Sequence, residues 1–356
     1  MRLLLFFALI LSGCTQQLPP TSQAVDGWTM AAPDEAGFNP ALIAETITFI
    51  EEDEHADFSS LVVARNGALV VEQYFNGHGP DSLRDMRSAG KSITSALVGI
   101  AIEEGFLPGI DTPALPLFPT YSPVANDGAD KQAITIKHLL TMTSGIDADA
   151  DDDTSPGYES KMEVTPDWVR FVLDLPMART PDTGWTYSSA SSFLAGAAVE
   201  ETSGLTLAAF AEQWLFGPLG IDDYYWAQTP SGRTVGQGNL YMRGRDMAKI
   251  GQLYLDGGRW QGRQVLPEAW VEASVGALYP VPWNGYDGYG YSWYTHTLEV
   301  DGRAFNYFFA SGNGGNKIYV FPNEQMVVIT QSAAYNTRYG QGRSFEILRR
   351  VLAAVV

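Results

Sequence analysis

An α+β fold is what this 356-residue sequence predicts: an antiparallel sheet flanked by helices, plus a mainly helical lobe. The first observation behind it is a strand pair near the N-terminus, whose apolar runs are separated by Asn66-Gly67. The second is a strand pair near the C-terminus, joined by Pro322-Asn323-Glu324. The third is that helix signals and turns dominate the middle. We therefore expect a sheet lobe of about 36–108 and 236–356, with a helical lobe of about 109–235 inserted between its halves.

Local signals support each element of the sheet lobe. Asn39 precedes Pro40 and an apolar pattern at helical spacing up to Ile50, which predicts a capped helix. Residues 61–64 and 69–71 are the apolar runs on either side of Asn-Gly, the strongest short signal for a hairpin. Near the C-terminus we expect two strands and then an amphipathic helix, at 317–321, 326–330 and about 345–351.

The composition is that of an ordinary soluble globular protein, with 45% hydrophobic and 12% aromatic residues. Asp and Glu number 41 against 22 Lys and Arg, which gives a formal net charge of −19. Such a surface repels phosphate backbones, so nucleic acid is excluded as a partner. The four histidines lack metal-ligand spacing, and the single cysteine excludes a disulfide and a cysteine metal site. The sequence thus predicts no metal and no cofactor.

The N-terminus carries an export pattern. A basic second residue precedes an apolar run at 3–11 that is too short to span a bilayer. The run ends in Leu11-Ser12-Gly13-Cys14, which resembles the bacterial lipobox, where the cysteine becomes the lipidated first residue of the mature chain. We expect a lipoprotein signal peptide at 1–14, a lipid anchor at Cys14 that contacts the membrane, and a polar tether at 15–35. These features place the protein on the bacterial cell envelope, at the outer membrane or its periplasmic face in a Gram-negative cell. The alternative is a plain signal peptide with an incidental cysteine.

An acidic run at 147–153 holds five aspartates. A solvated acidic loop is the favoured interpretation, because the glycine and the terminal glutamate of an EF-hand calcium loop are missing. Whether this loop binds a cation is left open.

Ser88-Ala89-Gly90-Lys91 is the pattern that indicates chemistry. Apolar residues at helical spacing follow it as far as Gly105, a natural helix stop, so the serine and the lysine share one helix face. The serine then lies in the first turn, near free backbone N–H groups and the positive helix end. A serine hydroxyl is a weak nucleophile until a neighbouring base takes its proton. A lysine can be that base when burial and a helix N-terminus lower its pKa from about 10.4 toward 7–8.

Two further elements stand downstream. Trp185-Thr186-Tyr187-Ser188-Ser189 leads into a helix of small residues, so Tyr187 is expected in a loop beside a helix start. Ala310-Ser311-Gly312-Asn313-Gly314-Gly315 precedes the strand at 317–321. Glycines beside a strand let a ligand approach the backbone, where a free N–H can bind an oxyanion. Taken singly, Tyr187 is better explained as a core or rim aromatic residue, and a tight turn is the plain alternative for the glycines.

Together, and in this order, the three elements resemble the Ser-x-x-Lys, Tyr-x-Asn/Ser and Lys/His-Thr-Gly patterns of the serine β-lactamase and penicillin-binding-protein superfamily. The nearer resemblance is to its class C-like branch, which includes esterases, D-aminopeptidases and 6-aminohexanoate-dimer hydrolases. Residues 134–145 and 245–254 are similar to further motifs of that branch. The resemblance runs from about Gly37 to the C-terminus. It implies a β-lactamase/transpeptidase-like fold of 36–356, with the serine-bearing helix between the sheet and the helical lobe.

The resemblance also implies roles for the matching residues. Ser88 would be the acylated nucleophile, and Lys91 and Tyr187 would share the general-base and general-acid work. The N–H groups of Ser88 and Gly315 would form the oxyanion hole. Ser189 matches the third position of the Tyr-x-Asn/Ser pattern, where it would hydrogen-bond Lys91 or the substrate.

Gly312, Asn313 and Gly314 match the third pattern as substrate-binding positions. Gly312 departs from that pattern, because Lys or His stands there in β-lactamases and helps to hold the β-lactam carboxylate. The expected activity is therefore cleavage of a carboxylic ester or small amide through an acyl-enzyme, with aryl esters preferred over penicillins. Aromatic residues that are expected to line an apolar acyl pocket are Trp185, Tyr289, Tyr291 and Trp293.

Three alternatives stay open at this stage. One is a penicillin-binding or penicillin-sensing module that is acylated and then stalls, which a burst without turnover would reveal. Another is a β-lactamase or D-Ala-D-Ala carboxypeptidase. The last is a structural lipoprotein on the same fold, and the intact set of Ser88, Lys91 and Tyr187 argues against it.

Overall fold

The structure is a computed structural model that describes residues 26–282 and 285–356. Within these ranges, every helix is too short or too polar to cross a lipid bilayer. The expected signal peptide at 1–14 and the lipidation of Cys14 lie outside the described residues and stay predictions.

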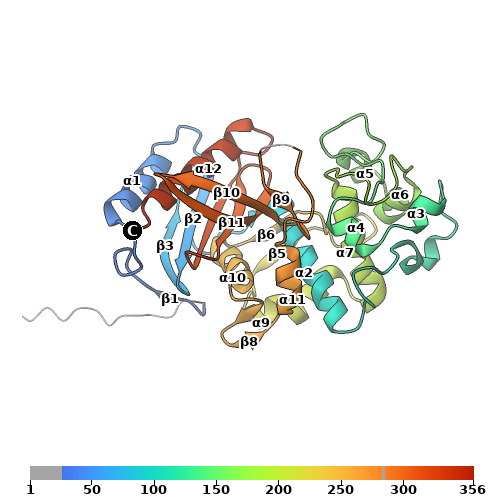
Figure 1. The fold of residues 1–356 in the computed structure, drawn as a ribbon, viewed down its shortest axis with the longest axis horizontal. Coiled ribbons are helices and arrows are strands. Elements are labelled where there is room, and N and C mark those ends of the chain that lie inside the picture. Colours follow the sequence, from blue (N-terminus) through green and yellow to red (C-terminus); the bar gives the residue numbers. More distant parts are fainter. Residues whose placement is uncertain (1–25, 283–284) are drawn as a thin grey trace, which may run out of the picture.

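The main sheet has eight strands in the order β1-β3-β2-β13-β12-β11-β10-β9 (Figure 1). Its neighbours pair antiparallel, as predicted, except that β1 and β3 are parallel. Strands from both ends of the chain meet where β2 pairs with β13. The strands are β1 Thr29–Met30, β2 Phe58–Arg65, β3 Ala68–Tyr74, β9 Gly288–Tyr289, β10 Tyr294–Val300, β11 Arg303–Gly312, β12 Asn316–Phe321 and β13 Met326–Ser332.

Two hydrophobic cores form because strand side chains alternate between the faces of the sheet. Val62 and Val327 join the core that also holds Met247 and Ile250 of α10 (Gly244–Leu255). Their neighbours in the strands, such as Val63 and Val328, join the other core, which is covered by α1 (Pro40–Glu51) and α12 (Arg338–Ala353). Both predicted helices of the sheet lobe are thus confirmed, and Asn39 caps α1 by accepting a hydrogen bond from the Ala41 N–H.

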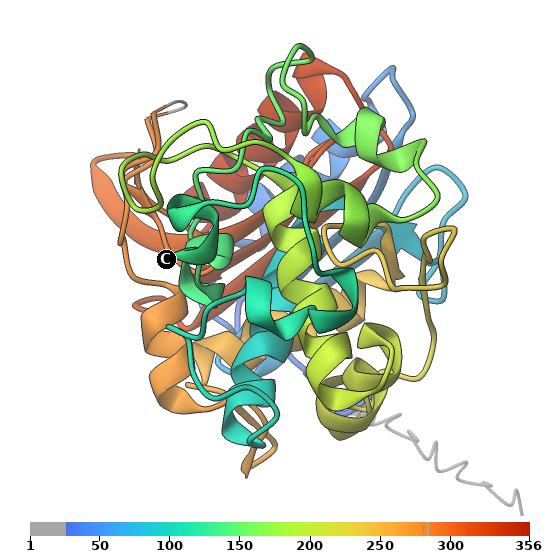
Figure 2. The same cartoon turned by 90° about the vertical axis from the view of Figure 1, so that its right-hand side faces the viewer.

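The helical lobe lies beside the sheet lobe, and α2 lies where the two meet, in contact with both α7 and β11 (Figures 1 and 2). Residues 90–101 of α2 are buried without interruption, which fits a helix enclosed on all sides. A short 3₁₀ turn, Arg87–Ala89, leads into α2.

The remaining helices are α2 Gly90–Glu103, α3 Ala129–Gln132, α4 Ile136–Leu140, α5 Glu159–Glu163, α6 Trp168–Asp174, α7 Ser189–Ser203, α8 Leu207–Ala211, α9 Gly217–Leu219 and α11 Glu268–Ser274. Smaller sheets pair β4 (Arg84–Asp85) with β6 (Leu240–Met242), β6 with β5 (Tyr224–Trp226), and β7 (Arg259–Trp260) with β8 (Arg263–Gln264).

The predicted tether at 15–35 is wrong over its last part. Trp28 is 1% exposed and packs edge-to-face on Trp260, with 5.2 Å between the ring centroids. Thr29 and Met30 pair with β3, and Asp26 forms an ion pair with Arg245. The folded domain therefore begins by residue 26. The sequence did not predict this start, because an isolated tryptophan and a two-residue strand form too weak a pattern.

Candidate active site

An open cleft of about 930 Å³ lies between the two lobes and brings several predicted site residues together. Ser88, Tyr187 and Ser189 line it from the helical side. Gly312 and Asn313 line it from the end of β11. The N-terminal turns of α12 form a further wall, with Thr337, Arg338, Gln341, Gly342 and Phe345.

Ser88 and Lys91 are in direct contact at the start of α2. Lys91 Nζ donates hydrogen bonds to Ser88 Oγ at 3.0 Å and to the Gln237 carbonyl at 2.9 Å. Lys91 is 2% exposed, whereas Ser88 is half-buried and open to the cleft. The i, i+3 spacing therefore does what the sequence predicted, since it places an amine against a hydroxyl that substrate can reach.

The turn that carries Ser88 is held by its neighbours. Arg87 has a φ of 52°, an uncommon left-handed conformation for a residue other than glycine. The Arg87 N–H donates to Asp85 Oδ1 at 2.8 Å, and the guanidinium stacks over the Tyr335 ring at 4.0 Å. Gly312 is required beside this turn, because an added Cβ would lie 2.1 Å from the Met86 carbonyl. The end of β11 thus lies against the backbone of the nucleophile turn.

Tyr187 belongs to a loop that is fixed on both sides. The Thr186 N–H donates to the Met142 carbonyl at 2.9 Å, and the Ala150 N–H donates to the Tyr187 carbonyl at 2.9 Å. Ser188 caps α7 by accepting a hydrogen bond from the Ser191 N–H. Lys91 Nζ lies 5.1 Å from the centroid of the Tyr187 ring. Tyr187 is therefore next to the Ser88–Lys91 pair.

The third predicted element is only partly at the cleft. Gly315 lies outside the cleft lining, and its N–H donates to the Gly312 carbonyl at 3.3 Å. It packs on α12, where an added Cβ would lie 2.3 Å from the Gly340 carbonyl. Gly314 also packs away from the cleft, toward Tyr335. The structure thus places Gly312 and Asn313 at the cleft but not Gly314 or Gly315, because the turn bends away after Asn313.

Ser189 is at the cleft, where the sequence predicts a hydrogen bond to Lys91 or to the substrate. The hydrogen bonds that Lys91 Nζ donates within the described residues go to Ser88 and Gln237, and Ser189 receives none of them. Ser189 begins α7 and is 3% exposed. Because Ser189 lines the cleft and is not bonded to Lys91, contact with the substrate stays its predicted role.

The four aromatic residues that the sequence predicts in an acyl pocket do not line the cleft. Tyr289, Tyr291 and Trp293 belong to the protein core, and Trp185 packs beside Tyr187 with 6.2 Å between their centroids. The tyrosine and phenylalanine residues that line the cleft are Tyr187 in the loop before α7, Tyr286 in the loop before β9, Tyr294, Tyr307, Phe309 and Tyr319 in strands of the main sheet, and Phe345 in α12. A period-2 pattern does not say which face of a strand turns toward a cleft, so the sequence could not separate the two sets.

Charged residues that belong to none of the predicted motifs also line the cleft. Lys317, the second residue of β12, is 2% exposed, and burial lowers its pKa to about 7. Its Nζ donates a hydrogen bond to Ser311 Oγ. Across the cleft stand Asp151 and Glu159, and burial together with Asp149 raises the pKa of Asp151. The one available signal was a lysine inside an otherwise apolar strand.

The acidic run at 147–153 forms a loop at the edge of the cleft. Asp147 and Asp149 are bridged by Ser155, whose Oγ donates to Asp147 and accepts from the Asp149 N–H. Asp152 accepts two hydrogen bonds from Thr154. Among the described residues, no cluster of three acidic, histidine or cysteine side chains is arranged to hold a metal ion.

A family model described as Beta-lactamase matches residues 50–352. The chain belongs to the Beta-lactamase family. Members of this family are serine hydrolases, and the chain is such a hydrolase. Its β-lactamase/transpeptidase-like fold is confirmed by solved structures. One is a penicillin-binding protein homologue from Caulobacter crescentus, with a TM-score of 0.71, 17% identity and coverage of 92% of this chain and 99% of that one. Another is a putative 6-aminohexanoate-dimer hydrolase from Bacillus anthracis, with a TM-score of 0.67, 19% identity and coverage of 83% and 79%.

Curated relatives of this Beta-lactamase family protein carry several activities. The 6-aminohexanoate-dimer hydrolase of Paenarthrobacter ureafaciens is 26% identical over 72% of this chain and 67% of its own length. Esterase EstB of Burkholderia gladioli is 28% identical over 58% of this chain, and the match spans about half of EstB (54%). Penicillin-binding protein 4* of Bacillus subtilis is 25% identical over 48% of this chain and 38% of its own length.

Proposed function

We propose that this hydrolase cleaves a carboxylic ester or a small amide through an acyl-enzyme on Ser88. The observation that carries the proposal is the 3.0 Å contact between Lys91 Nζ and Ser88 Oγ at the cleft. Lys91 acts as the general base that takes the hydroxyl proton while Oγ attacks the carbonyl carbon, and the proton then passes to the leaving group. Tyr187, beside the lysine, shares that proton transfer. Water then attacks the acyl carbon with the same groups as base, and the free acid leaves.

The oxyanion hole in this proposal consists of the N–H groups of Ser88 and Asn313. Both residues line the cleft, and β11 ends against the turn that carries Ser88. Within the described residues, neither N–H is engaged in a backbone hydrogen bond. Asn313 replaces Gly315 in this role because the Gly315 N–H is bound to the Gly312 carbonyl. Two such donors stabilise the charge that develops on the carbonyl oxygen.

The choice of ester or amide rests on the cleft and on the relatives. The wall of the cleft holds seven tyrosine and phenylalanine residues, which suit an apolar acyl or leaving group. The relatives named as a 6-aminohexanoate-dimer hydrolase and as an esterase act on an amide and on esters, respectively, according to those names. Short-chain aryl esters and small linear amides are therefore the first substrates to test.

The test is labelling with a fluorophosphonate probe together with turnover of a p-nitrophenyl ester. We expect the probe to modify Ser88 and Ser88→Ala to lose both labelling and turnover. Lys91→Ala and Tyr187→Phe should each lower kcat/KM by about 10²–10⁴, the usual size of a general-base contribution. Ser92→Ala is the control, because Ser92 lies on the same helix but donates to the Ser292 carbonyl away from the cleft. Full turnover in Ser88→Ala would refute the proposal.

A second candidate is a penicillin-binding module that is acylated and turns over slowly. Lys317 favours it, since this lysine supplies a cation to a cleft in which Gly312 offers none. A chromogenic cephalosporin distinguishes the two candidates. One equivalent of product released without turnover supports the module, whereas steady ester hydrolysis with no cephalosporin burst supports the hydrolase.

A further inference from the structure

Lys317 is a buried lysine at the cleft without a charged partner. It is 2% exposed, and within the described residues no carboxylate lies within ion-pair distance of its Nζ. The ammonium donates one hydrogen bond, to Ser311 Oγ, and lies 5.3 Å from the centroid of the Phe309 ring. An ammonium has three donors, so two of them are left to serve something other than Ser311. A buried charge without a partner is costly, which makes this arrangement unusual for a purely structural residue.

Lys131 and Lys249, the buried lysines remote from Ser88, show what a satisfied ammonium looks like in this protein. Lys131 Nζ donates to three backbone carbonyls, each at 2.7 Å. Lys249 Nζ pairs with Asp246 at 2.9 Å and donates to the Gly220 carbonyl at 2.9 Å. Neither lysine lines the cleft. The incomplete partner set of Lys317 therefore coincides with access to the cleft, as expected if a ligand completes it.

We propose that Lys317 and Ser311 form a subsite for a substrate carboxylate, so that the enzyme prefers esters or amides that carry a free acid group. The proposal rests on the proposed function, because the same cleft must hold the scissile bond at Ser88. Lys317 pairs with Ser311 across β12 and β11, and Ser311 immediately precedes Gly312 and Asn313. The subsite is thus two residues along β11 from the proposed oxyanion donor, a separation that one substrate molecule can span.

The charges around the cleft restrict where an anion can bind. Arg338 on α12 and His296 on β10 share the sheet side of the cleft with Lys317. The phenols on that side are Tyr286, Tyr294, Tyr307 and Tyr319. Asp151 and Glu159 stand on the helical side and repel an anion. A carboxylate is therefore directed to the strand side, where Lys317 can donate two hydrogen bonds to it.

The experiment compares substrates that differ in one carboxylate. Mono-p-nitrophenyl glutarate is measured against p-nitrophenyl butyrate for the acyl side, and 4-acetoxybenzoate against 4-acetoxybenzamide for the leaving-group side. We expect kcat/KM to favour the anionic member of at least one pair, and Lys317→Met to reduce that preference by about 10–100-fold, the value of a charge-assisted hydrogen bond. Lys137→Met, a lysine outside the cleft, should leave the preference unchanged.

The results of these measurements either support or overturn the carboxylate subsite at Lys317 and Ser311. Equal kcat/KM within both pairs for the wild type, or a preference that survives in Lys317→Met, would overturn the subsite. Neutral esters report the proposed function separately, since their turnover depends on Ser88 and not on Lys317. If esters are not turned over at all, glutarate is titrated against glutaramide by calorimetry, and binding of glutarate alone, lost in Lys317→Met, supports the subsite. Should Lys317→Met fail to fold, Ser311→Ala removes the hydroxyl that orients the ammonium and is expected to weaken the same preference.

Discussion

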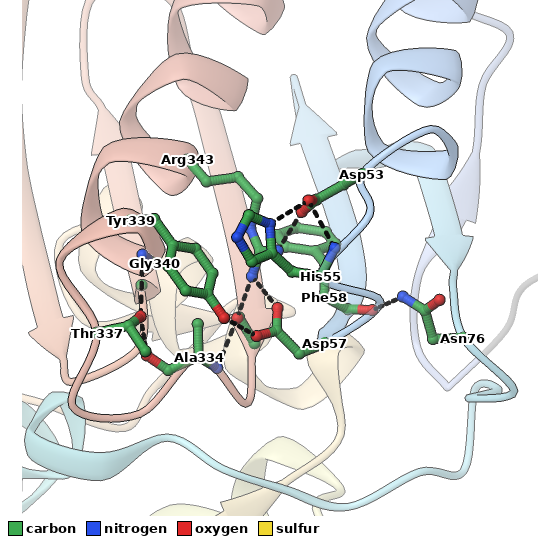
Figure 3. A network of polar contacts seen from close by, with 12 residues as sticks. Asp53, His55, Asp57, Phe58, Asn76, Ala334, Thr337, Tyr339, Gly340 and Arg343 are labelled. Carbon is green, nitrogen blue, oxygen red and sulfur yellow. Dashed lines mark hydrogen bonds and ion pairs between the residues drawn. The ribbon is translucent and has the colours of Figure 1, made fainter.

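Two polar regions lie on different sides of the first turns of α12, and they treat charge in opposite ways. On one side, Arg343 is 8% exposed and pairs with both Asp53 and Asp57. Tyr339 donates to Asp57, and its ring stacks on His55 with 3.8 Å between the centroids (Figure 3). On the other side lies the cleft, which is lined by Lys317 and by Ser88, the contact of Lys91. Both lysines are more deeply buried than Arg343 and have no acidic partner within the described residues.

The difference separates charges that hold the fold from charges that are free to act. Burial alone would raise the pKa of Asp53, but the hydrogen bonds from Arg343 and His55 outweigh it and hold that pKa below its usual value. The Arg343 network joins α12 to the segment that follows α1, so its charges are neutralised inside the protein. Lys91 is held by a serine and a carbonyl, and Lys317 by a serine and a ring, so within the described residues no acidic side chain neutralises either charge.

The largest stability effect is expected on the paired side. Arg343→Met leaves two partly buried carboxylates without their cation, so the free energy of unfolding should fall by about 2–4 kcal/mol. Urea unfolding measures this change. Arg350→Met on the same helix is the control, because its pair with Glu346 is half-exposed and should contribute about 0.5 kcal/mol or less. The kcat/KM of folded Arg343→Met should stay within a few-fold of the wild type, and a loss comparable to that of Lys91→Ala would show that the two sides of α12 are not separate.

A gain in stability, rather than a loss, is expected when Lys317 is replaced. Burial lowers its folded-state pKa from 10.5 to about 7, so the folded state disfavours the charged form. Lys317→Met should therefore stabilise the protein, by up to about 4 kcal/mol at or below pH 7. The gain in the free energy of unfolding from Lys317→Met should shrink as the pH rises from 7 to 10.5, because Lys317 in the unfolded state then also loses its proton. Lys249→Met, which strands Asp246, should instead destabilise. A less stable Lys317→Met at pH 7 would mean that the ammonium is fully satisfied in the fold.

Much of this architecture could be predicted from the sequence because its signals are local. Asn39-Pro40 fixes the start of α1, Asn66-Gly67 fixes the β2–β3 hairpin, and the i, i+3 spacing of Ser88 and Lys91 fixes their contact. These features depend on neighbours in the chain, so a pattern of a few residues is enough to specify them.

Other features depend on contacts between distant segments, and these escaped prediction. Gly315 resembles an oxyanion donor in the sequence, yet its N–H is taken by Gly312 and its Cα packs against α12. Lys317 reads as an ordinary strand residue until its partner across the sheet, Ser311, places it at the cleft. Trp28 has significance only through Trp260, more than 200 positions along the chain. Register and helix packing decide such contacts, and a single sequence does not encode them locally.

The central proposal is that Lys91, whose Nζ lies 3.0 Å from Ser88 Oγ, serves an acyl transfer on Ser88. Its most direct test is the intact mass of the enzyme, quenched with acid within milliseconds of mixing with a p-nitrophenyl ester. We expect a form of the enzyme that is heavier by one acyl group, with the added mass on the peptide that contains Ser88. We also expect this form to accumulate less in Lys91→Ala and to be absent in Ser88→Ala. An acyl group found on another residue, or full ester turnover by Ser88→Ala, would contradict the account.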